Sequence, residues 1–177
     1  MDVKKAIEER GSVRKYEKRE VPDRLLRKLI DAARLAPSGR NAQPSKYFIV
    51  KDGETKAKLR KNKVFAQAFV YKAPAIIVCC AEPGAYTEHD EEWDAPRKIR
   101  AIRDLSIASS FLVLRATELG LGTCYIGWVK KEKIKEVLGI PTENFVLFVI
   151  TVGYPAEQPE PTSRKSIEEI QLQPHKY

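Results

Sequence analysis

The sequence predicts one domain in which helices and strands share a common core. Its 177 residues, 43% of them hydrophobic, are enough for a single domain with a substantial core. Residues 25–36 and 102–116 repeat apolar side chains at helical intervals, which is typical of helices that bury one face. Residues 75–81 and 145–154 are almost continuously apolar, which is typical of strands buried on both sides. No linker or repeat divides the chain, so we expect a single domain over residues 1–177.

The expected helices and strands follow one another along the chain. We expect helices over residues 2–10, 22–36, 54–62, 97–119 and 131–138. We expect strands over residues 47–50, 75–81, 120–128 and 145–154. Pro22 suits the first residue of its helix, and Gly11 follows the first helix as a residue that can adopt a left-handed conformation. Residues 82–96 have no period and are expected to form a loop.

The net charge of +8 has two interpretations, attraction to an anionic partner or a solvated surface. Basic residues are spread along the helices and interleaved with acidic ones, so we expect no nucleic-acid partner and keep a nucleotide as a possible ligand. No apolar run approaches the ~18 residues of a membrane span, and Met1 leads into no signal-type segment. We therefore expect a cytoplasmic protein without a membrane partner.

The usual side chains of acid–base catalysis and metal binding are scarce. Cys79, Cys80 and Cys124 show no metal-binding or redox spacing, and they fit buried thiols in a reducing compartment. His89 and His175 lack ligand spacing, so we expect no metal site. The sequence offers no Ser-His-Asp set and no credible Cys-His pair. If the protein is an enzyme, a cofactor is expected to carry the chemistry, and no catalytic side chain is assigned.

The segment 36–44 joins a helix to a strand and is both stiff and polar. Pro37 and Pro44 fix φ, whereas Gly39 permits a positive φ. Three of its side chains offer hydroxyl or amide groups that suit a planar polar ligand: Ser38, Asn41 and Gln43. Taken alone, the segment fits an ordinary turn better than a ligand site, because turns favour these same residue types.

Three further segments could hold an anion or a ligand. Residues 10–16 place two arginines around a glycine and a serine, which suits a phosphate monoester and equally suits a helix C-terminus. Residues 120–128 are punctuated by glycines, so the backbone there can approach a ligand closely. They match neither a dinucleotide fingerprint nor a Walker A loop. Arg164 and Lys165, in the Pro-rich tail, are either a solvated basic pair or a third arm of an anion site.

Together these separated segments resemble the nitroreductase family of FMN-dependent oxidoreductases. The motifs that carry the resemblance, in chain order, are Arg10–Tyr16, Ala36–Pro44, Gly120–Gly127 and Arg164-Lys165 after Gly153-Tyr154-Pro155. The resemblance spans essentially the whole chain. It implies an α+β sandwich, with a central antiparallel-rich sheet flanked by helices, assembled as an intertwined homodimer with FMN at the interface. The C-terminal arm, about residues 155–177, is expected to wrap the partner subunit.

The resemblance also implies which residues would bind FMN. Arg10, Ser12 and Arg164 would hold the phosphate, and Arg14 would lie near the pyrimidine edge of the flavin. Gly11 lies between them, where the family often has Arg or His, so the phosphate would depend more on Arg10 and Arg164. The flavin would be contacted from the other subunit by Ser38, Asn41 and Gln43. The Gln67 amide would lie against the flavin. The backbone around Tyr125, Ile126 and Gly127 would face the flavin ring near N5.

The activity implied is transfer of a hydride from NADH or NADPH, through flavin N5, to a small acceptor such as a nitroaromatic, a quinone or a flavin. Two alternatives stay open. The first is another reaction on the same fold, reductive dehalogenation or flavin fragmentation, although residues 82–96 are short and plain for the lid of such an enzyme. The second is a basic nucleic-acid-binding module, whose only support is the net charge.

Overall fold

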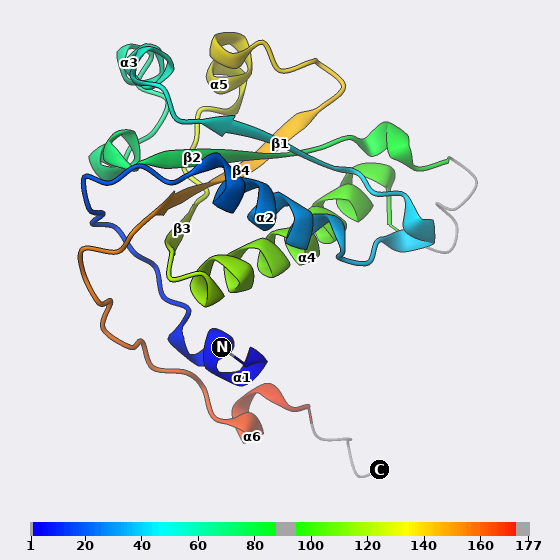
Figure 1. Ribbon diagram of the computed structural model, residues 1–177. Coiled ribbons are helices and arrows are strands. Elements are labelled where there is room, and N and C mark those ends of the chain that lie inside the picture. Colours follow the sequence, from blue (N-terminus) through cyan, green and yellow to red (C-terminus); the bar gives the residue numbers. More distant parts are fainter. Residues whose placement is uncertain (1, 88–94, 173–177) are drawn as a thin grey trace.

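The computed structural model describes residues 2–87 and 95–172, so His89 and His175 lie outside the described residues. A four-stranded antiparallel sheet in the order β1-β2-β4-β3 forms the centre of the molecule (Figure 1). Its strands are β1 (Ser45–Val50), β2 (Ala75–Ala81), β3 (Gly122–Ile126) and β4 (Phe145–Gly153). Helices cover both faces, which confirms the predicted α+β sandwich with an antiparallel sheet.

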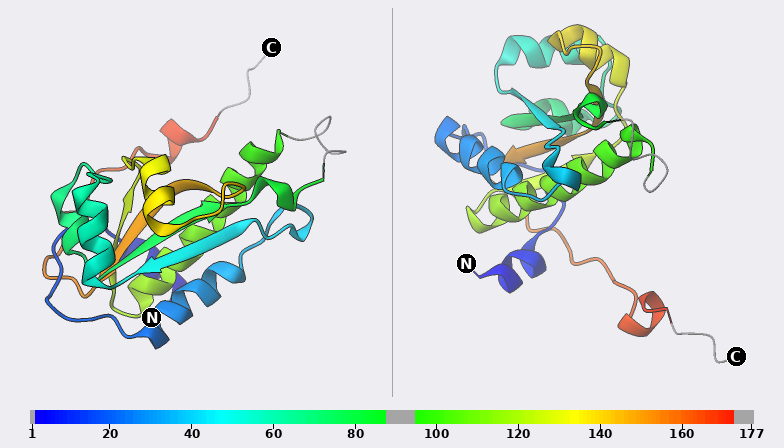
Figure 2. Two further views of the ribbon diagram at one scale, coloured as in Figure 1. Left: turned by 90° about the horizontal axis from the view of Figure 1, so that it is seen from above. Right: turned by 90° about the vertical axis from the view of Figure 1, so that its right-hand side faces the viewer.

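The helices divide into two layers and two outlying pieces (Figure 2). The α-helices are α1 (Val3–Glu9), α2 (Asp23–Arg34), α3 (Gly53–Lys61), α4 (Arg97–Glu118), α5 (Lys131–Leu138) and α6 (Ile167–Ile170). Short 3-10 helices are η1 (Gly39–Asn41), η2 (Ala68–Lys72) and η3 (Pro83–Ala85). The pair α2 and α4 packs on one face of the sheet, α3 and α5 on the other, while α1 and α6 lie outside these layers.

Strand β2 explains why the sequence shows an unbroken apolar run. All seven of its residues are buried, because strands flank it on both sides and helices cover both faces. Ile77 and Cys79 join the core beneath α2 and α4, whereas Ile76 and Cys80 join the core beneath α3 and α5. The described cysteines are free and buried, as the sequence predicts.

Several element boundaries differ from the predictions. Helix α2 begins at Asp23, with Pro22 as its N-cap. The residue that ends α1 is Arg10, with an extended ψ of 115°, and Gly11 has no positive φ because the chain goes directly into pairing with β3. Strand β1 begins two residues earlier than expected, and β3 is limited to five residues by its register with β4. The short helix α6 was not predicted.

The C-terminal tail begins by packing on its own chain, so its first residues do not belong to the arm that is expected to wrap the partner subunit. Tyr16 and Pro155 form a bridge, and the Ala156 amide donates to the Lys15 carbonyl at 3.0 Å. The Glu157 carboxylate accepts from the amides of Arg14 at 2.7 Å and Lys15 at 3.1 Å. Residues 160–172 are exposed and lie outside the two helical layers.

The hydrogen bonds from the Arg14 and Lys15 amides to Glu157 are expected to weaken in acid. The amide of Arg14, then that of Lys15 and the nearby positive charges, lower the pKa of Glu157. A carboxylate whose pKa is lowered by folding stabilises the fold above its unfolded pKa, about 4.3 for glutamate. That contribution is lost as the pH falls through the lower folded pKa. Hydrogen exchange at the Arg14 and Lys15 amides should therefore accelerate in acid, after correction for its intrinsic pH dependence.

Glu157→Gln is the matched control for the acid effect, because it removes the titrating carboxylate and keeps the size of the side chain. In that variant both amides are expected to exchange faster at neutral pH than in the unaltered chain, because a neutral amide oxygen accepts more weakly than a carboxylate, and to show no further acid transition. Equal protection of the two amides in Glu157→Gln and in the unaltered chain would contradict the hydrogen bonds from these amides to Glu157.

Among the residues that the structure describes, no helix is long and apolar enough to cross a membrane.

Candidate functional site

Backbone pairing places the segment 10–14 along the outer edge of β3. Ser12 forms a parallel bridge with Thr123, and the Val13 amide donates to the Thr123 carbonyl at 2.9 Å. Gly122 makes this close approach possible, since a Cβ there would lie 2.7–2.9 Å from side-chain atoms of Val13. Val13 itself is buried, at 5% exposure. The glycine in the predicted motif therefore serves the packing of the N-terminal segment against the strand.

The basic and hydroxyl groups of this segment gather around Cys124. Burial raises the pKa of the Cys124 thiol, and the Arg14 charge, the adjacent Ser12 side chain and the Arg10 charge oppose that rise. The Arg14 Nη1 donates to the Ser12 carbonyl at 3.2 Å. Arg14 therefore lies beside Ser12 at the edge of β3, and Arg10 belongs to the same segment, two residues before Ser12. Charged donors around a hydroxyl are a setting in which phosphate oxygens bind strongly.

The end of β3 supplies backbone groups beside this cluster. β3 is an edge strand, and Ser12 pairs with it only at Thr123. Because alternate residues of a strand direct their N–H and C=O groups to the same edge, those of Tyr125 point the same way as those of Thr123. No other strand in the described part of the chain pairs with that edge at Tyr125. Tyr125 and Gly127 are exposed, whereas Ile126 is buried on the opposite face.

Gln67 lies beside the residues that follow β3. It is the N-cap of η2, and its segment is tied to them by a bridge between Phe65 and Val129. The Lys130 amide also donates to the Val64 carbonyl at 2.9 Å. The Gln67 Oε1 atom is buried and has no hydrogen-bond partner among the described residues. A buried acceptor without a donor is costly, so this amide is suited to a polar ligand.

The polar loop before β1 is folded through unusual backbone conformations. Its positive φ angles belong to Arg40 (51°), Asn41 (56°) and Gln43 (50°), and not to Gly39, the residue that permits one most easily. Such conformations are uncommon for residues other than glycine and cost energy unless the surroundings fix them. The Gln43 backbone N–H donates to the Ser38 Oγ at 2.9 Å, and the Gln43 side-chain Nε2 donates to the Asn41 carbonyl at 3.2 Å.

Within one chain the loop lies far from the arginine cluster. The loop contacts Asp104 near the start of α4, whereas Thr123 follows the end of that helix at Glu118. At about 1.5 Å per residue, the helix between Asp104 and Glu118 spans roughly 20 Å. Figure 1 shows η1 and α1 at different ends of the molecule. The two halves of the predicted site therefore do not meet in one subunit.

Arg164 also stays apart from the cluster in the single chain. It lies in the exposed part of the tail, and its Nη1 donates to the carbonyls of Thr162 at 2.9 Å and Ser163 at 3.0 Å. These hydrogen bonds hold Arg164 to its own segment, so the structure does not bring it to Arg10 or Ser12.

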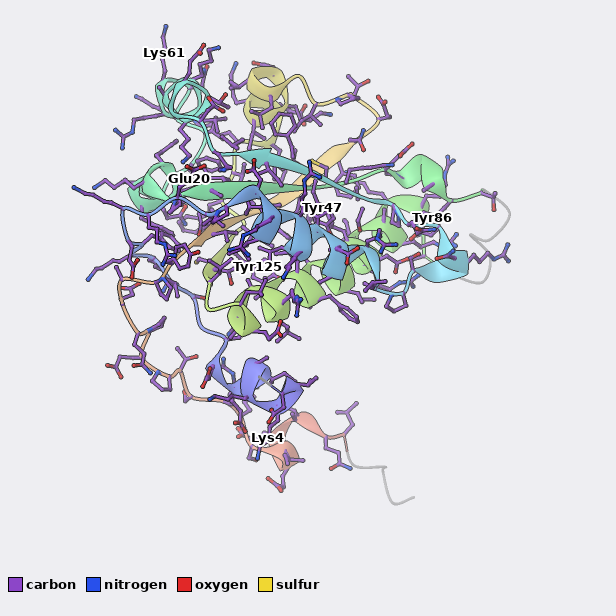
Figure 3. All side chains as sticks on the ribbon, viewed as in Figure 1. Lys4, Glu20, Tyr47, Lys61, Tyr86 and Tyr125 are labelled. Carbon is purple, nitrogen blue, oxygen red and sulfur yellow. The ribbon has the colours of Figure 1, made fainter. Side chains whose placement is uncertain are left out.

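The loop borders a cavity of about 220 Å³ between α2, α4 and β1. Ser38, Gln43, Tyr47 and Asp104 contribute to its wall. Sequence reasoning overlooked Asp104, although a carboxylate on the buried stripe of a helix is a recognisable signal, because an unpaired charge is rarely buried. Figure 3 shows Tyr86 at the same end of the molecule as this loop.

Comparisons with known proteins agree with these features. The chain matches the model of the Nitroreductase family over residues 7–66 and 61–154. It is 31% identical to a Thermus thermophilus protein named NADH dehydrogenase, over 97% of this chain and 96% of that protein. It is 27% identical to a Bacillus subtilis protein named FMN reductase, over 89% of this chain and 67% of that protein.

A solved structure agrees as well. The crystal structure of a nitroreductase family protein from Clostridium difficile 630 matches with a TM-score of 0.83 and 28% identity, over 97% of this chain and 98% of that one. The family model covers most of the sequence, and a relative above 30% identity covers nearly all of it. The chain belongs to the nitroreductase family.

Proposed function

We propose that this protein is an FMN-dependent oxidoreductase that takes a hydride from NADH or NADPH and delivers it to a nitroaromatic, quinone or flavin acceptor. The observation that carries the proposal is the cluster of Arg10, Ser12 and Arg14 beside the open edge of β3. The unpartnered Gln67 Oε1 lies in the segment that pairs with the residues following β3. One of the relatives is named FMN reductase, which supports FMN as the flavin.

The residues present fit FMN by their chemistry. Arg10 and Ser12 would bind the phosphate, and Arg14 would stabilise negative charge at the pyrimidine edge of the flavin. Gln67 would donate and accept through its amide, and the backbone of Tyr125 and Gly127 would hold the ring at the edge of β3. Bound FMN would supply the hydride chemistry, so the side chains need only bind, orient and balance charge.

The complete site is proposed to need two subunits. Ser38, Asn41 and Gln43 lie too far from Arg10 to act on the same ligand within one chain, so the partner subunit would supply them. Large apolar side chains are exposed on helices that are candidates for the dimer interface: Val3 and Ile7 on α1, Phe111 on α4, and Ile167 and Ile170 on α6. We propose a homodimer of one-domain chains, with the tail beyond residue 160, including Arg164, wrapped on the partner.

Absorption spectroscopy tests the proposed function. Addition of FMN to the purified protein is expected to give a bound-flavin spectrum, which bleaches when NADH or NADPH is added without oxygen. Riboflavin should bind much more weakly, because it lacks the phosphate that Arg10 and Ser12 would hold. A purified protein that holds no flavin and cannot be reconstituted with FMN would contradict the proposal. Flavin that binds but is not reduced by either nucleotide would contradict the proposed electron donor.

A further inference from the structure

Asp104 is a buried carboxylate at the point where α4 meets the polar loop. Its side chain is 3% exposed, and it lies on the stripe of α4 that also buries Leu105 and Ala108. The Gly39 amide donates to its Oδ2 at 2.7 Å, and the Tyr86 hydroxyl donates to the same oxygen. The Arg103 Nε donates to its Oδ1 at 3.1 Å. Three segments of the chain thus converge on one side chain.

The surroundings keep this carboxylate charged. Burial raises the pKa of Asp104, but the hydrogen bonds from Tyr86, Gly39 and Arg103, together with the Arg103 charge, outweigh that effect and lower it. Tyr86 is itself held in place, at 4% exposure, with the Arg100 guanidinium 4.3 Å from the centre of its ring. Because its donors include the Gly39 backbone amide, the Asp104 carboxylate anchors the loop in a fixed position, as a solvated ion pair at the surface would not.

The loop is fitted tightly onto this anchor. A Cβ at Gly39 would lie 3.3 Å from the Arg103 Nη2, 3.7 Å from the Asp104 Oδ2 and 3.8 Å from the Tyr86 Cε1. Gly39 does not have a positive φ. The glycine backbone thus lies close enough to Asp104 to donate its hydrogen bond, and an added Cβ would press only on the flexible end of the Arg103 side chain.

The residues after Gly39 need such an anchor. Arg40, Asn41 and Gln43 all have positive φ, and conformations of this kind persist only where surrounding contacts over-determine them. The Asp104 bond fixes the start of the loop, and the bond between Ser38 Oγ and the Gln43 amide closes it. Strain held by a buried anchor is a known way of pre-organising a binding loop.

We infer that Asp104 is a positioning residue, which holds the loop of Ser38, Asn41 and Gln43 in the conformation that binds FMN on the partner subunit. Tyr86 orients the carboxylate through its hydroxyl. The inference rests on the proposed function. It goes beyond that function by assigning the affinity for the cofactor partly to two residues outside the set proposed to bind it.

Fluorescence titration with FMN, together with thermal melting, tests this role in the full chain. Asp104→Ala is expected to raise the Kd for FMN about 10- to 100-fold, since it removes the acceptor of a charged hydrogen bond to the loop. Tyr86→Phe and Asp104→Asn keep the buried volume, and each should raise the Kd several-fold. Asp104→Asn is expected to bind more tightly than Asp104→Ala, because an amide oxygen can still accept from Gly39.

Asp52→Asn is the matched control, because it makes the same chemical change at an exposed N-cap of α3, where asparagine caps equally well. It should leave the Kd unchanged. If Asp104→Ala does not fold, Tyr86→Phe and Asp104→Asn still decide the question. Variants that melt at lower temperature but bind FMN like the unaltered chain would overturn the inference and leave the proposed function standing. Failure of the unaltered chain to bind FMN would overturn both.

Discussion

A chain carrying Arg10→Ala is expected to bind FMN about 10- to 100-fold more weakly than the unaltered chain, which corresponds to losing one charged hydrogen bond to the phosphate. Arg10 lies where α1 ends and the chain turns to pair with β3, so its side chain is placed by the backbone rather than by a flexible loop. Titration of FMN fluorescence measures the change.

Two comparisons separate a phosphate contact from a general effect of charge. Lys4→Ala removes one positive charge from the exposed side of α1, where Lys4 faces Glu8, and should leave the Kd for FMN nearly unchanged. Riboflavin has no phosphate, so its affinity should be the same for Arg10→Ala and the unaltered chain. Equal weakening of FMN and riboflavin would show that Arg10 acts through the fold and not on the phosphate.

Gly122→Ala is expected to destabilise the protein by about 1–3 kcal/mol, the usual cost of overpacking a closed contact. The added Cβ would lie 2.7–2.9 Å from the side chain of Val13. Either Val13 leaves its buried position or the segment 10–14 separates from β3. For a chain of this size we expect the melting temperature to fall by roughly 2–12 °C. FMN affinity should fall with it, because the same segment carries Arg10.

Gly53→Ala is the control for this substitution. Gly53 begins α3, and nothing lies within 4 Å of a Cβ added there. Alanine in place of a helical glycine is expected to be neutral or to stabilise by about 0.4–1 kcal/mol. An unchanged melting temperature for Gly122→Ala would contradict the close approach of Val13 and β3 that places the arginine cluster.

The sequence predicted those parts of the fold that depend on local patterns. The run 75–81 was predicted as a strand with its observed bounds, because a strand buried on both faces has no polar residue to interrupt it. Gly120 and Gly139 end helices, and both have positive φ. The antiparallel sheet came from the family resemblance and not from any pattern, since strand order depends on contacts between distant segments.

The features that the sequence could not predict depend on contacts between residues that are far apart in the chain. Glu157 caps amides more than 140 residues away, and no local pattern records that distance. In the sequence Gly39 was identified as a residue that permits a positive φ, because glycine is the usual choice for it. In the structure the Gly39 amide donates to Asp104, and the positive φ angles belong to residues that follow it. The roles assigned to the site residues remain predictions.

The most direct test of the account is to pair two different variant subunits. One chain carries Arg10→Ala, and the other carries Asn41→Ala with Gln43→Ala, so each homodimer has two damaged sites. In a dimer that contains one of each, one site receives both defects and the other receives none. Random pairing of equal amounts should restore wild-type FMN affinity to about one quarter of the sites. If none of the sites regains that affinity, the site is not shared between two subunits.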